Sequence, residues 1–139
     1  MAGKRILVVG AGFAGLYAAM RLRRAVELGH HVTVVNAENF MLYHPFQPEV
    51  ASGTIDPRAV VVPLRRAVRH CDVVIGEVER VDHGERIAQV RLADGRETAM
   101  GYDTVVLAPG SWARVLPIPG LAQGGVGFKT VQELSLIHI

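Results

Sequence analysis

Three glycines near the start of the chain have the spacing G-x-G-x-x-G, which allows a backbone turn to hold phosphate groups. The stretch consists of Gly10, Ala11, Gly12, Phe13, Ala14 and Gly15. Gly10 permits a tight turn, Gly12 lets a pyrophosphate approach because it has no Cβ, and Gly15 lets a helix lie close to a strand. The N-terminus of such a helix offers N–H groups and the positive end of its dipole to phosphate. The spacing therefore predicts a dinucleotide-binding turn.

The segments on both sides of the glycines are those that such a turn requires. The apolar run over residues 6–9 is typical of a buried parallel strand. Residues 13–28 carry apolar side chains at helical spacing, and Gly29 is suited to end the helix. A second apolar strand over residues 32–35 completes a β–α–β unit within about thirty residues. The alternative is a glycine-rich turn that packs a helix on a strand without a ligand, and the local context favours the ligand-binding interpretation.

The residue at the end of the second predicted strand is Asn36, where an acidic residue usually hydrogen-bonds an adenosine ribose. An asparagine amide can both donate to and accept from ribose hydroxyls, so Asn36 stays a candidate ribose contact. The missing carboxylate weakens an interpretation as a simple NAD site, and no arginine for an NADP phosphate follows at this point. His30 and His31 precede the strand, and we interpret them as loop residues instead of metal ligands.

Residues 39–58 form a long segment with three prolines and several aromatic side chains. We predict irregular structure for it. A loop of this length is usually functional or disordered, and this one is too apolar for a linker. We therefore expect it to fold over a ligand or another domain, and a hydrophobic plug beneath the sheet is the alternative.

The residues after this segment alternate between short apolar runs and turn signals. We predict a short helix over residues 63–69 and a buried strand over residues 72–76. Residues 77–100 alternate polar and apolar side chains around an Asp94-Gly95 turn, which predicts an antiparallel meander. A last buried strand over residues 103–107 precedes prolines and glycines that indicate loops. Together these elements predict an α/β fold, a Rossmann-like parallel sheet with an inserted antiparallel β-meander.

The composition is that of one ordinary globular domain, because half of the 139 residues are apolar and a fifth are charged. A net charge of +2 gives no argument for nucleic acid as a partner. The single cysteine, Cys71, excludes a disulfide framework, fits a reducing compartment and is expected in the core. No membrane span or signal peptide is evident, so we expect a cytoplasmic protein. Two groups of arginines fall on predicted helices: Arg21, Arg23 and Arg24, and Arg65, Arg66 and Arg69. We interpret both groups as solvated helix faces, and the alternative is that one of them lines a partner surface.

Three stretches together resemble the FAD-binding half of the two-dinucleotide-domain flavoproteins. Within that group the chain resembles the type II NADH dehydrogenases, which are single-subunit, non-proton-pumping NADH:quinone oxidoreductases. The first and third stretches are shared widely among flavoproteins, whereas the second is more particular to this family. They are residues 9–16, then residues 39–40 with 48–54, then residues 102–111 with 117–120 and 128–130, and the resemblance reaches Glu133.

The resemblance implies an FAD site. Its pyrophosphate would be held by the residues ahead of Gly15, namely Gly10, Ala11, Gly12, Phe13 and Ala14. The ribose would contact Asn36 and Ala37, and the adenine would contact the backbone of Val78. The pocket would be closed near the phosphates by Ala108, Pro109 and Gly110. Residues 108–110 depart from the usual Ala-Thr-Gly triplet, so a hydroxyl and an N–H group are missing, and Asn36 replaces the more frequent acid. The resemblance assigns no catalytic side chain and no metal ligand to this segment. The chain also lacks the redox-active cysteine pair of the disulfide reductases.

The resemblance also implies a longer parent protein. Family members carry a second Rossmann domain for NADH, a return segment that completes the FAD site, and a C-terminal amphipathic region for quinone and membrane contact. We therefore predict that residues 1–133 are the truncated N-terminal part of an FAD/NAD(P)-binding domain and that residues 134–139 are a non-native, adapter-derived tail. The parent would pass electrons from NADH through FAD to a quinone, peripherally at the cytoplasmic face of the cell membrane, and a homodimer is allowed. The fragment alone would be inactive and marginally stable.

Two other functions stay open on the sequence. A ferredoxin- or rubredoxin-type flavin reductase shares the first and third stretches. A non-enzymatic nucleotide-binding module is expected if the 139 residues are the natural product. The electron acceptor and the choice between NADH and NADPH depend on residues outside this segment.

Overall fold

The computed structural model describes residues 3–111, 114, 116–127, 129–130 and 133. The predicted tail over residues 134–139 and Phe128 of the third family stretch lie outside the described residues. The chain divides into two compact units. The first unit comprises Met1–Met41 and Pro63–Gly110, and the second comprises Leu42–Val62 and Ser111–Ile139.

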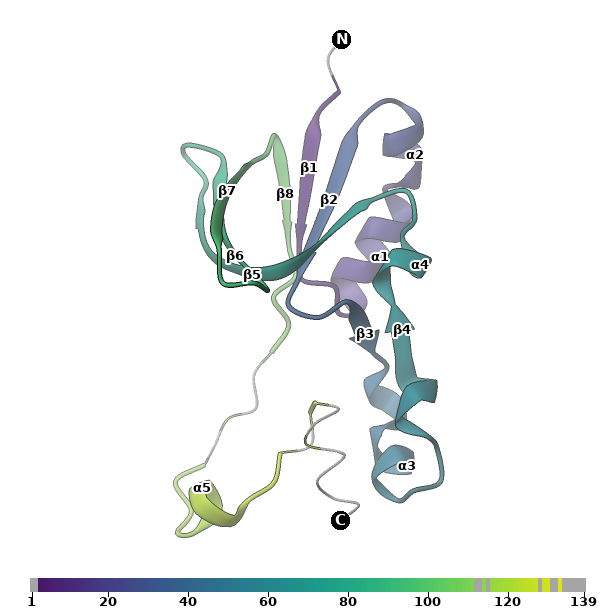
Figure 1. Ribbon diagram of the computed structural model, residues 1–139, viewed down its shortest axis with the longest axis vertical. Helices are drawn as coiled ribbons and strands as arrows, with labels where there is room; N and C mark the ends of the chain where they lie inside the picture. The colour runs from purple at the N-terminus through teal and green to yellow at the C-terminus, as the bar shows by residue number, and fades with distance from the viewer. Residues whose placement is uncertain (1–2, 112–113, 115, 128, 131–132, 134–139) are drawn as a thin grey trace. The chain divides into compact units, whose positions relative to one another are not determined.

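The first unit is built on a six-stranded mixed sheet. Its strands are β1 (Arg5–Val9), β2 (His31–Asn36), β5 (Asp72–Asp82), β6 (Ile87–Leu92), β7 (Glu97–Gly101) and β8 (Thr104–Leu107). Their order across the sheet is β7-β6-β5-β2-β1-β8 (Figure 1). Strands β8, β1, β2 and the first part of β5 run parallel, whereas β5, β6 and β7 pair antiparallel. The prediction of a Rossmann-like parallel sheet with an inserted antiparallel meander is confirmed.

Strand β5 is longer than the sequence indicates because it pairs with two different partners. The sequence predicts two segments here, but they belong to one strand of 11 residues. From Asp72 to Ile75 the strand pairs in parallel with β2. From Gly76 it pairs antiparallel with β6, with a bulge between Val78 and Arg80. The change from an apolar run to an alternating pattern therefore marks a change of partner and of burial, not the end of a strand.

The single helix predicted over residues 13–28 is divided into two helices, α1 (Phe13–Arg21) and α2 (Arg23–Glu27). Leu22 separates them because its ψ of 1° lies outside the helical range, and its N–H is shared between two carbonyls of α1 at 3.1 Å each. No glycine or proline marks this break in the sequence. Gly29 adopts a φ of +88° immediately after α2, as expected for a glycine that ends a helix.

The two histidines after α2 differ in their positions. His31 lies in β2 opposite Arg5, so the prediction that it is a loop residue is wrong. The strand starts there because the N–H of His31 donates to the carbonyl of Lys4 at 2.9 Å. His30 lies outside the strand, and its Nδ1 accepts a hydrogen bond from the backbone N–H of Lys4 at 3.0 Å.

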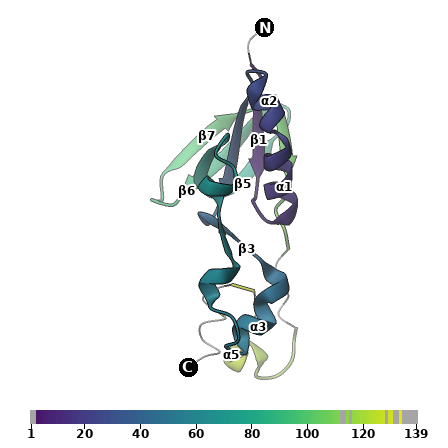
Figure 2. The same cartoon turned by 90° about the vertical axis from the view of Figure 1, so that its right-hand side faces the viewer.

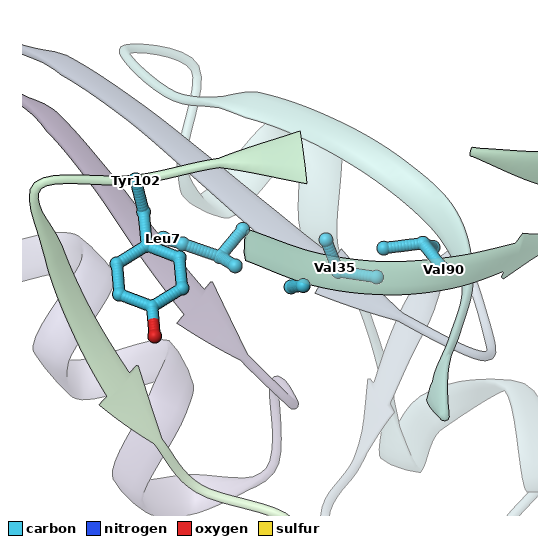
Figure 3. Close-up of a cluster of buried hydrophobic side chains, with 5 residues drawn as sticks. Leu7, Val35, Val90 and Tyr102 are labelled. Atoms are coloured by element: carbon cyan, nitrogen blue, oxygen red, sulfur yellow. The ribbon is translucent and has the colours of Figure 1, made fainter. Parts of the chain in front are cut away.

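Alternating residues of the parallel strands form a core on both faces of the sheet. Figure 2 shows α1 and α2 lying one after the other along one face, where they pack against β1 and β2. Val8 and Val34, which are paired in register, are fully buried. Their sequence neighbours point to the opposite face. There a buried cluster joins the parallel strands to the meander (Figure 3): Leu7, Val35, Ala88, Val90 and Tyr102.

The second unit has short elements where the sequence predicts an irregular loop. The chain enters it through β3 (Phe40–Leu42) and leaves it through β4 (Val61–Pro63), which form a two-stranded sheet. Between these strands lie α3 (Gln47–Ala51) and 3₁₀ helices over His44–Phe46 and Pro57–Val60. The prediction of irregular structure over residues 39–58 is therefore wrong. Each of its three prolines lies in the first turn of one of these short helices, where a fixed φ favours the helix and the missing N–H has no partner to lose.

Two further short helices differ from the predictions in extent or existence. Helix α4 (Leu64–Ala67) covers only part of the predicted helix, and Pro63 precedes it as the last residue of β4. Helix α5 (Leu121–Gly124) lies where the sequence predicts only loops. It follows Gly120, whose φ of +82° turns the chain into the helix.

Candidate dinucleotide-binding site

The glycine turn lies at the edge of the sheet where the parallel strands end, which we call the carboxyl edge (Figure 1). The register places Val9 of β1 beside Val35 of β2 and beside Leu107 of β8. Asn36, at the end of β2, pairs with Ile75 of β5. The residues that follow these strand ends are therefore neighbours, and ligands of open α/β sheets bind at such an edge.

Gly10 and Gly15 lie in contacts that leave no room for a side chain. Gly10 has a φ of +85°, and a Cβ built on it would collide with the carbonyl oxygen of Ala108. A Cβ on Gly15 would collide with the carbonyl oxygen of Gly10. The N–H of Gly10 donates to the carbonyl of Val35 at 2.8 Å. These two glycines therefore hold the turn, α1 and β8 together.

Gly12 differs from the other two glycines of the motif. Its φ of −68° is open to any residue, and a Cβ built on it would meet no atom within 4 Å. Packing within the protein therefore does not explain a glycine here. A backbone that must be approached closely by a pyrophosphate does explain it. The space in front of Gly12 is the observation that fits a bound dinucleotide.

Helix α1 begins immediately after Gly12, which is its N-cap residue. The first N–H groups of a helix have no partners within the helix. No side chain caps this end of α1, and its first turn contains no acidic residue. Phe13 and Ala14, the first two helical residues, are exposed. The positive end of the helix dipole is therefore open to a phosphate group.

Asn36 joins the end of β2 to the glycine turn. Its side-chain oxygen accepts a hydrogen bond from the N–H of Ala11 at 2.8 Å. Its side-chain nitrogen donates to the carbonyl of Glu38 at 2.8 Å and to that of Phe40 at 3.5 Å. An amide oxygen has two lone pairs, so one remains for a ribose hydroxyl. Asn36 thus orders the turn and can still accept from a ligand.

A hollow of about 410 Å³ lies beside the end of β2 and the start of the meander. Ala37, the second predicted ribose contact, lines it. Val78, the predicted adenine contact, does not, and its side chain packs against the core cluster around Leu7. The backbone contact predicted for Val78 stays a prediction. The complete lining is Ala37, Gly76, Glu77, Arg91, Leu92, Ala93 and Gly95.

The residues that β5 and β6 contribute to this hollow were not predicted from the sequence. Arg91 forms ion pairs with Glu77 at 3.0 Å and with Glu79 at 3.1 Å. Gly76 gave the only available signal, because a glycine within a strand often marks a close approach of two backbones. A Cβ on Gly76 would lie 2.5 Å from the carbonyl oxygen of Arg91.

Ala108, Pro109 and Gly110 follow β8 at the same edge. The N–H of Ala108 donates to the carbonyl of Val9 at 2.8 Å, which holds Ala108 against the glycine turn. Pro109 and Gly110 are exposed, and Gly110 has a φ of +74°. Pro109 has no N–H to offer to a phosphate. The structure therefore brings Ala108 to the turn and leaves the following two residues open to solvent.

Cys71 lies outside the candidate site and is half-buried, so its prediction as a core residue is wrong. Its Sγ lies 3.9 Å from the carbonyl oxygen of Ala19. Burial raises the pKa of the thiol to about 11, and the charge of Asp72 adds to this effect. The thiol is therefore protonated at neutral pH and is a weak nucleophile.

The described part of the chain offers neither a metal-binding cluster nor a membrane-spanning helix. No three His, Cys, Asp or Glu side chains gather there as a group that could hold a metal ion. None of the helices described is both long enough and apolar enough to cross a membrane.

Comparison with known proteins gives matches along almost the whole chain. A family model described as pyridine nucleotide-disulphide oxidoreductase matches residues 4–138. The external alternative NADH-ubiquinone oxidoreductase of Yarrowia lipolytica mitochondria is 24% identical over 97% of the chain. The demethylphylloquinone reductase NdbB of Synechocystis sp. is 26% identical over 93% of the chain. The solved structure of NDH2 from Plasmodium falciparum has a TM-score of 0.86 at 18% identity and covers 97% of the chain.

The matched proteins are much longer than this chain. The chain spans 24% of the Yarrowia enzyme, 33% of NdbB and 28% of the Plasmodium NDH2 chain. At 18% identity, the structural similarity establishes the fold of the matched part alone.

Proposed function

Because the chain belongs to the pyridine nucleotide-disulphide oxidoreductase family, we propose that its carboxyl edge binds the ADP part of FAD. Residues 1–133 would be the N-terminal part of the FAD-binding domain of an enzyme that passes electrons from NADH through FAD to a quinone. The main support is Gly12, whose open space and uncapped helix N-terminus fit a pyrophosphate and have no other explanation in the packing.

Each part of the cofactor has a proposed contact at this edge. The pyrophosphate would lie against residues 10–15, and the ribose would donate to the side-chain oxygen of Asn36. The adenosine would lie in the hollow lined by Ala37, with its adenine near the backbone of Val78. Residues 108–110 would close the site near the phosphates. The first-turn N–H groups of α1 would supply the charge complementarity that two phosphates require.

Bound FAD supplies the hydride and one-electron chemistry, which no side chain of this segment can supply. The residues of the chain therefore bind and orient the cofactor. Gly10 and Gly15 fix the turn, and Asn36 holds it against the end of β2 through Ala11. No side chain is proposed as a catalytic acid, base or nucleophile, which agrees with a single, protonated cysteine thiol.

The names of two relatives support a quinone as the electron acceptor of the parent. One is an NADH-ubiquinone oxidoreductase and the other a demethylphylloquinone reductase. This favours the quinone over the iron–sulfur proteins that a ferredoxin or rubredoxin reductase would reduce. The NADH and quinone sites would lie in the rest of the parent, which would be peripheral at the cytoplasmic face of a membrane and could form a homodimer. The segment over residues 39–58 would cover the ligand or a neighbouring domain, and residues 134–139 would be a non-native tail.

The proposal is tested by reading the source gene past the codon for Glu133 and producing the protein that this longer frame encodes. We expect a purified protein with yellow bound flavin that oxidises NADH with a soluble quinone. Reduction of an iron–sulfur protein without quinone reduction would favour the flavin reductase instead. A colourless protein that binds no added FAD would contradict the proposal. A genuine stop codon after Ile139 would leave only nucleotide binding as the function of this chain.

A further inference from the structure

A second concentration of charge lies in the first unit, on helices α2 and α4 and on the residues that follow α4. Helix α2 leads into β2 and helix α4 leads into β5, so both helices end where these parallel strands begin. Figure 1 shows both helices on the same side of the sheet. The residues that line the hollow between these helices are all different from those of the candidate dinucleotide site.

An open hollow of about 390 Å³ lies between the start of α2 and the end of α4 with the turn that follows it. Its lining consists of Arg23, Arg66, Ala67, Arg69 and His70. Three of these five side chains are guanidinium groups, and none is a carboxylate. The Nε2 of His70 lies 2.9 Å from the carbonyl oxygen of Ala19, so α1 fixes the position of the imidazole ring at the hollow. The other ring nitrogen, Nδ1, is not needed for that contact.

The positive charges of the hollow are only partly balanced by the protein. Arg23 forms an ion pair with Glu27 at 3.1 Å, and both side chains are largely exposed. Within the described part of the chain, the side chains of Arg66 and Arg69 form no ion pair and no hydrogen bond. Asp72 begins β5 nearby but does not line the hollow. Like charges held together in this way repel one another unless an anion lies between them.

The type of charge indicates the type of anion. A guanidinium group presents several N–H donors in a planar fork that matches two oxygens of a phosphate. Three such groups around one hollow can satisfy a tetrahedral oxyanion from different directions. We propose that the hollow formed by Arg23, Arg66, Arg69 and His70 is a binding site for a phosphate group.

The phosphate could belong to a small phosphorylated molecule in solution or to the headgroup of an anionic lipid. Both sources share the chemistry of the site, and the experiment separates them. The site does not depend on the proposed FAD binding, because it uses other residues. A purely structural role is the competing explanation, since basic side chains near the last turns of helices stabilise them.

The test titrates the 139-residue chain with inorganic phosphate at constant ionic strength, with binding followed by calorimetry and by the NMR shifts of residues 66–70. The variant Arg23→Gln/Arg66→Gln removes two guanidinium groups from the hollow. The control Arg24→Gln/Arg65→Gln removes the same charge from the same two helices at positions that do not line it. We expect saturable binding that weakens about tenfold or more in the first variant, because charge-assisted hydrogen bonds are lost, and changes less than about twofold in the control.

Circular dichroism checks that both variants fold. If the first variant does not fold, the single substitution Arg69→Gln replaces it, and it must weaken phosphate binding without lowering the unfolding temperature. Equal weakening in variant and control would overturn the proposal in favour of general charge attraction. The absence of saturable phosphate binding to the native chain would also overturn it.

A second experiment, sedimentation with lipid vesicles, identifies the source of the phosphate. The chain is sedimented with vesicles of phosphatidylcholine alone or with added phosphatidylglycerol. A lipid site predicts sedimentation only with phosphatidylglycerol, with competition by free phosphate and loss in Arg23→Gln/Arg66→Gln. A site for a soluble phosphate predicts binding of inorganic phosphate without sedimentation. Either pattern supports the site, whereas sedimentation that both double variants retain would contradict a role for the hollow.

Discussion

The two compact units of the chain differ in how far each buries its own apolar residues. The first unit has a six-stranded sheet with buried side chains on both faces. Among the residues that the structure describes, the buried cluster of the second unit has three members, Leu42, Val50 and Val60. Both units leave large apolar side chains exposed, with 71% of Leu28 and 59% of Tyr17 accessible in the first unit and 47% of Phe46 and 55% of Ile118 in the second. The units differ in the size of the described buried cluster, which is smaller in the second unit.

The difference in the size of the buried clusters indicates that the two units use their apolar residues for different purposes. In the first unit, the same residues that form the sheet also place the glycine turn, Asn36 and Ala108 at one edge. Folding of that unit therefore creates the candidate site. In the second unit, the exposed side chains of Phe46, Ile118 and Val126 are not part of its described buried cluster.

The largest expected effect is that of Gly10→Ala on the first unit. The new methyl group would force a positive φ on a non-glycine residue and collide with the carbonyl of Ala108. We expect the free energy of unfolding to fall by roughly 3 kcal/mol or more. Urea denaturation followed by circular dichroism measures this. A loss below about 1 kcal/mol would show that the turn and β8 are not held together as described.

The next effect tests whether the second unit is stabilised by its own small cluster. Val50 is fully buried there, so Val50→Ala should remove about 2 kcal/mol of local stability. Hydrogen exchange should become faster over residues 42–62 and stay unchanged in β1 and β2. If hydrogen exchange became faster by the same factor in β1 and β2, the two units would unfold together. That result would contradict a separate stability for the second unit.

A smaller effect is expected for Asn36→Ala at the carboxyl edge. The substitution leaves the N–H of Ala11 without its acceptor, and Ala11 is only 1% exposed. We expect a loss of about 1–2 kcal/mol in the free energy of unfolding. Asn36→Asp is the matched control, since it keeps an acceptor for Ala11 and loses the side-chain donor to the carbonyls of Glu38 and Phe40. If both variants lose the same stability, the bond to Ala11 does not matter for the turn.

The smallest effect concerns the pH dependence of the first unit at Asp103. A hydrogen bond from the backbone N–H of Arg5, at 2.7 Å, lowers the pKa of this carboxyl group, and the Arg5 charge helps. Because the pKa is lower in the folded state, the stabilisation is present above the ordinary aspartate pKa, about 3.9, and is lost as the pH falls through the folded value. Asp103→Asn should therefore reduce the loss of stability below about pH 4. Identical acid-unfolding curves for native chain and variant would contradict this.

Local signals in the sequence were sufficient for the parts of the fold that depend on neighbouring residues. The glycine turn, the first two strands and the Asp94-Gly95 turn follow from such signals, and Gly95 has the φ of +84° that its turn requires. The breaks at Leu22 and within β5 could not be predicted, because they depend on which partner each residue meets. The short helices over residues 44–60 could not be predicted from their prolines, because a proline can either interrupt a helix or begin one. In this unit each proline lies in the first turn of a helix.

The candidate site was predictable only in the part that the motif encodes. Residues 10–15 could be identified from their spacing. The bond between Asn36 and Ala11 joins residues 25 positions apart, and no local pattern reports it. Arg91 reaches the hollow through the antiparallel pairing of β6 with β5, which opposes it to Glu77. Contacts of this kind depend on the register of the sheet and become visible only in the folded chain.

We propose that the carboxyl edge binds the ADP part of a dinucleotide. Position 12 would then be a glycine because the pyrophosphate must approach the backbone closely there. The most direct measurement is an NMR titration of the native chain and of Gly12→Ala with ADP. We predict shifts at residues 10–15, 36–37 and 108–110 and in the hollow around Gly76 and Arg91 in the native chain. The shifts at residues 10–15 should be lost in Gly12→Ala, which should keep full stability because its methyl group meets no atom. Undiminished ADP binding by Gly12→Ala, or no shifts at this edge in the native chain, would contradict the account.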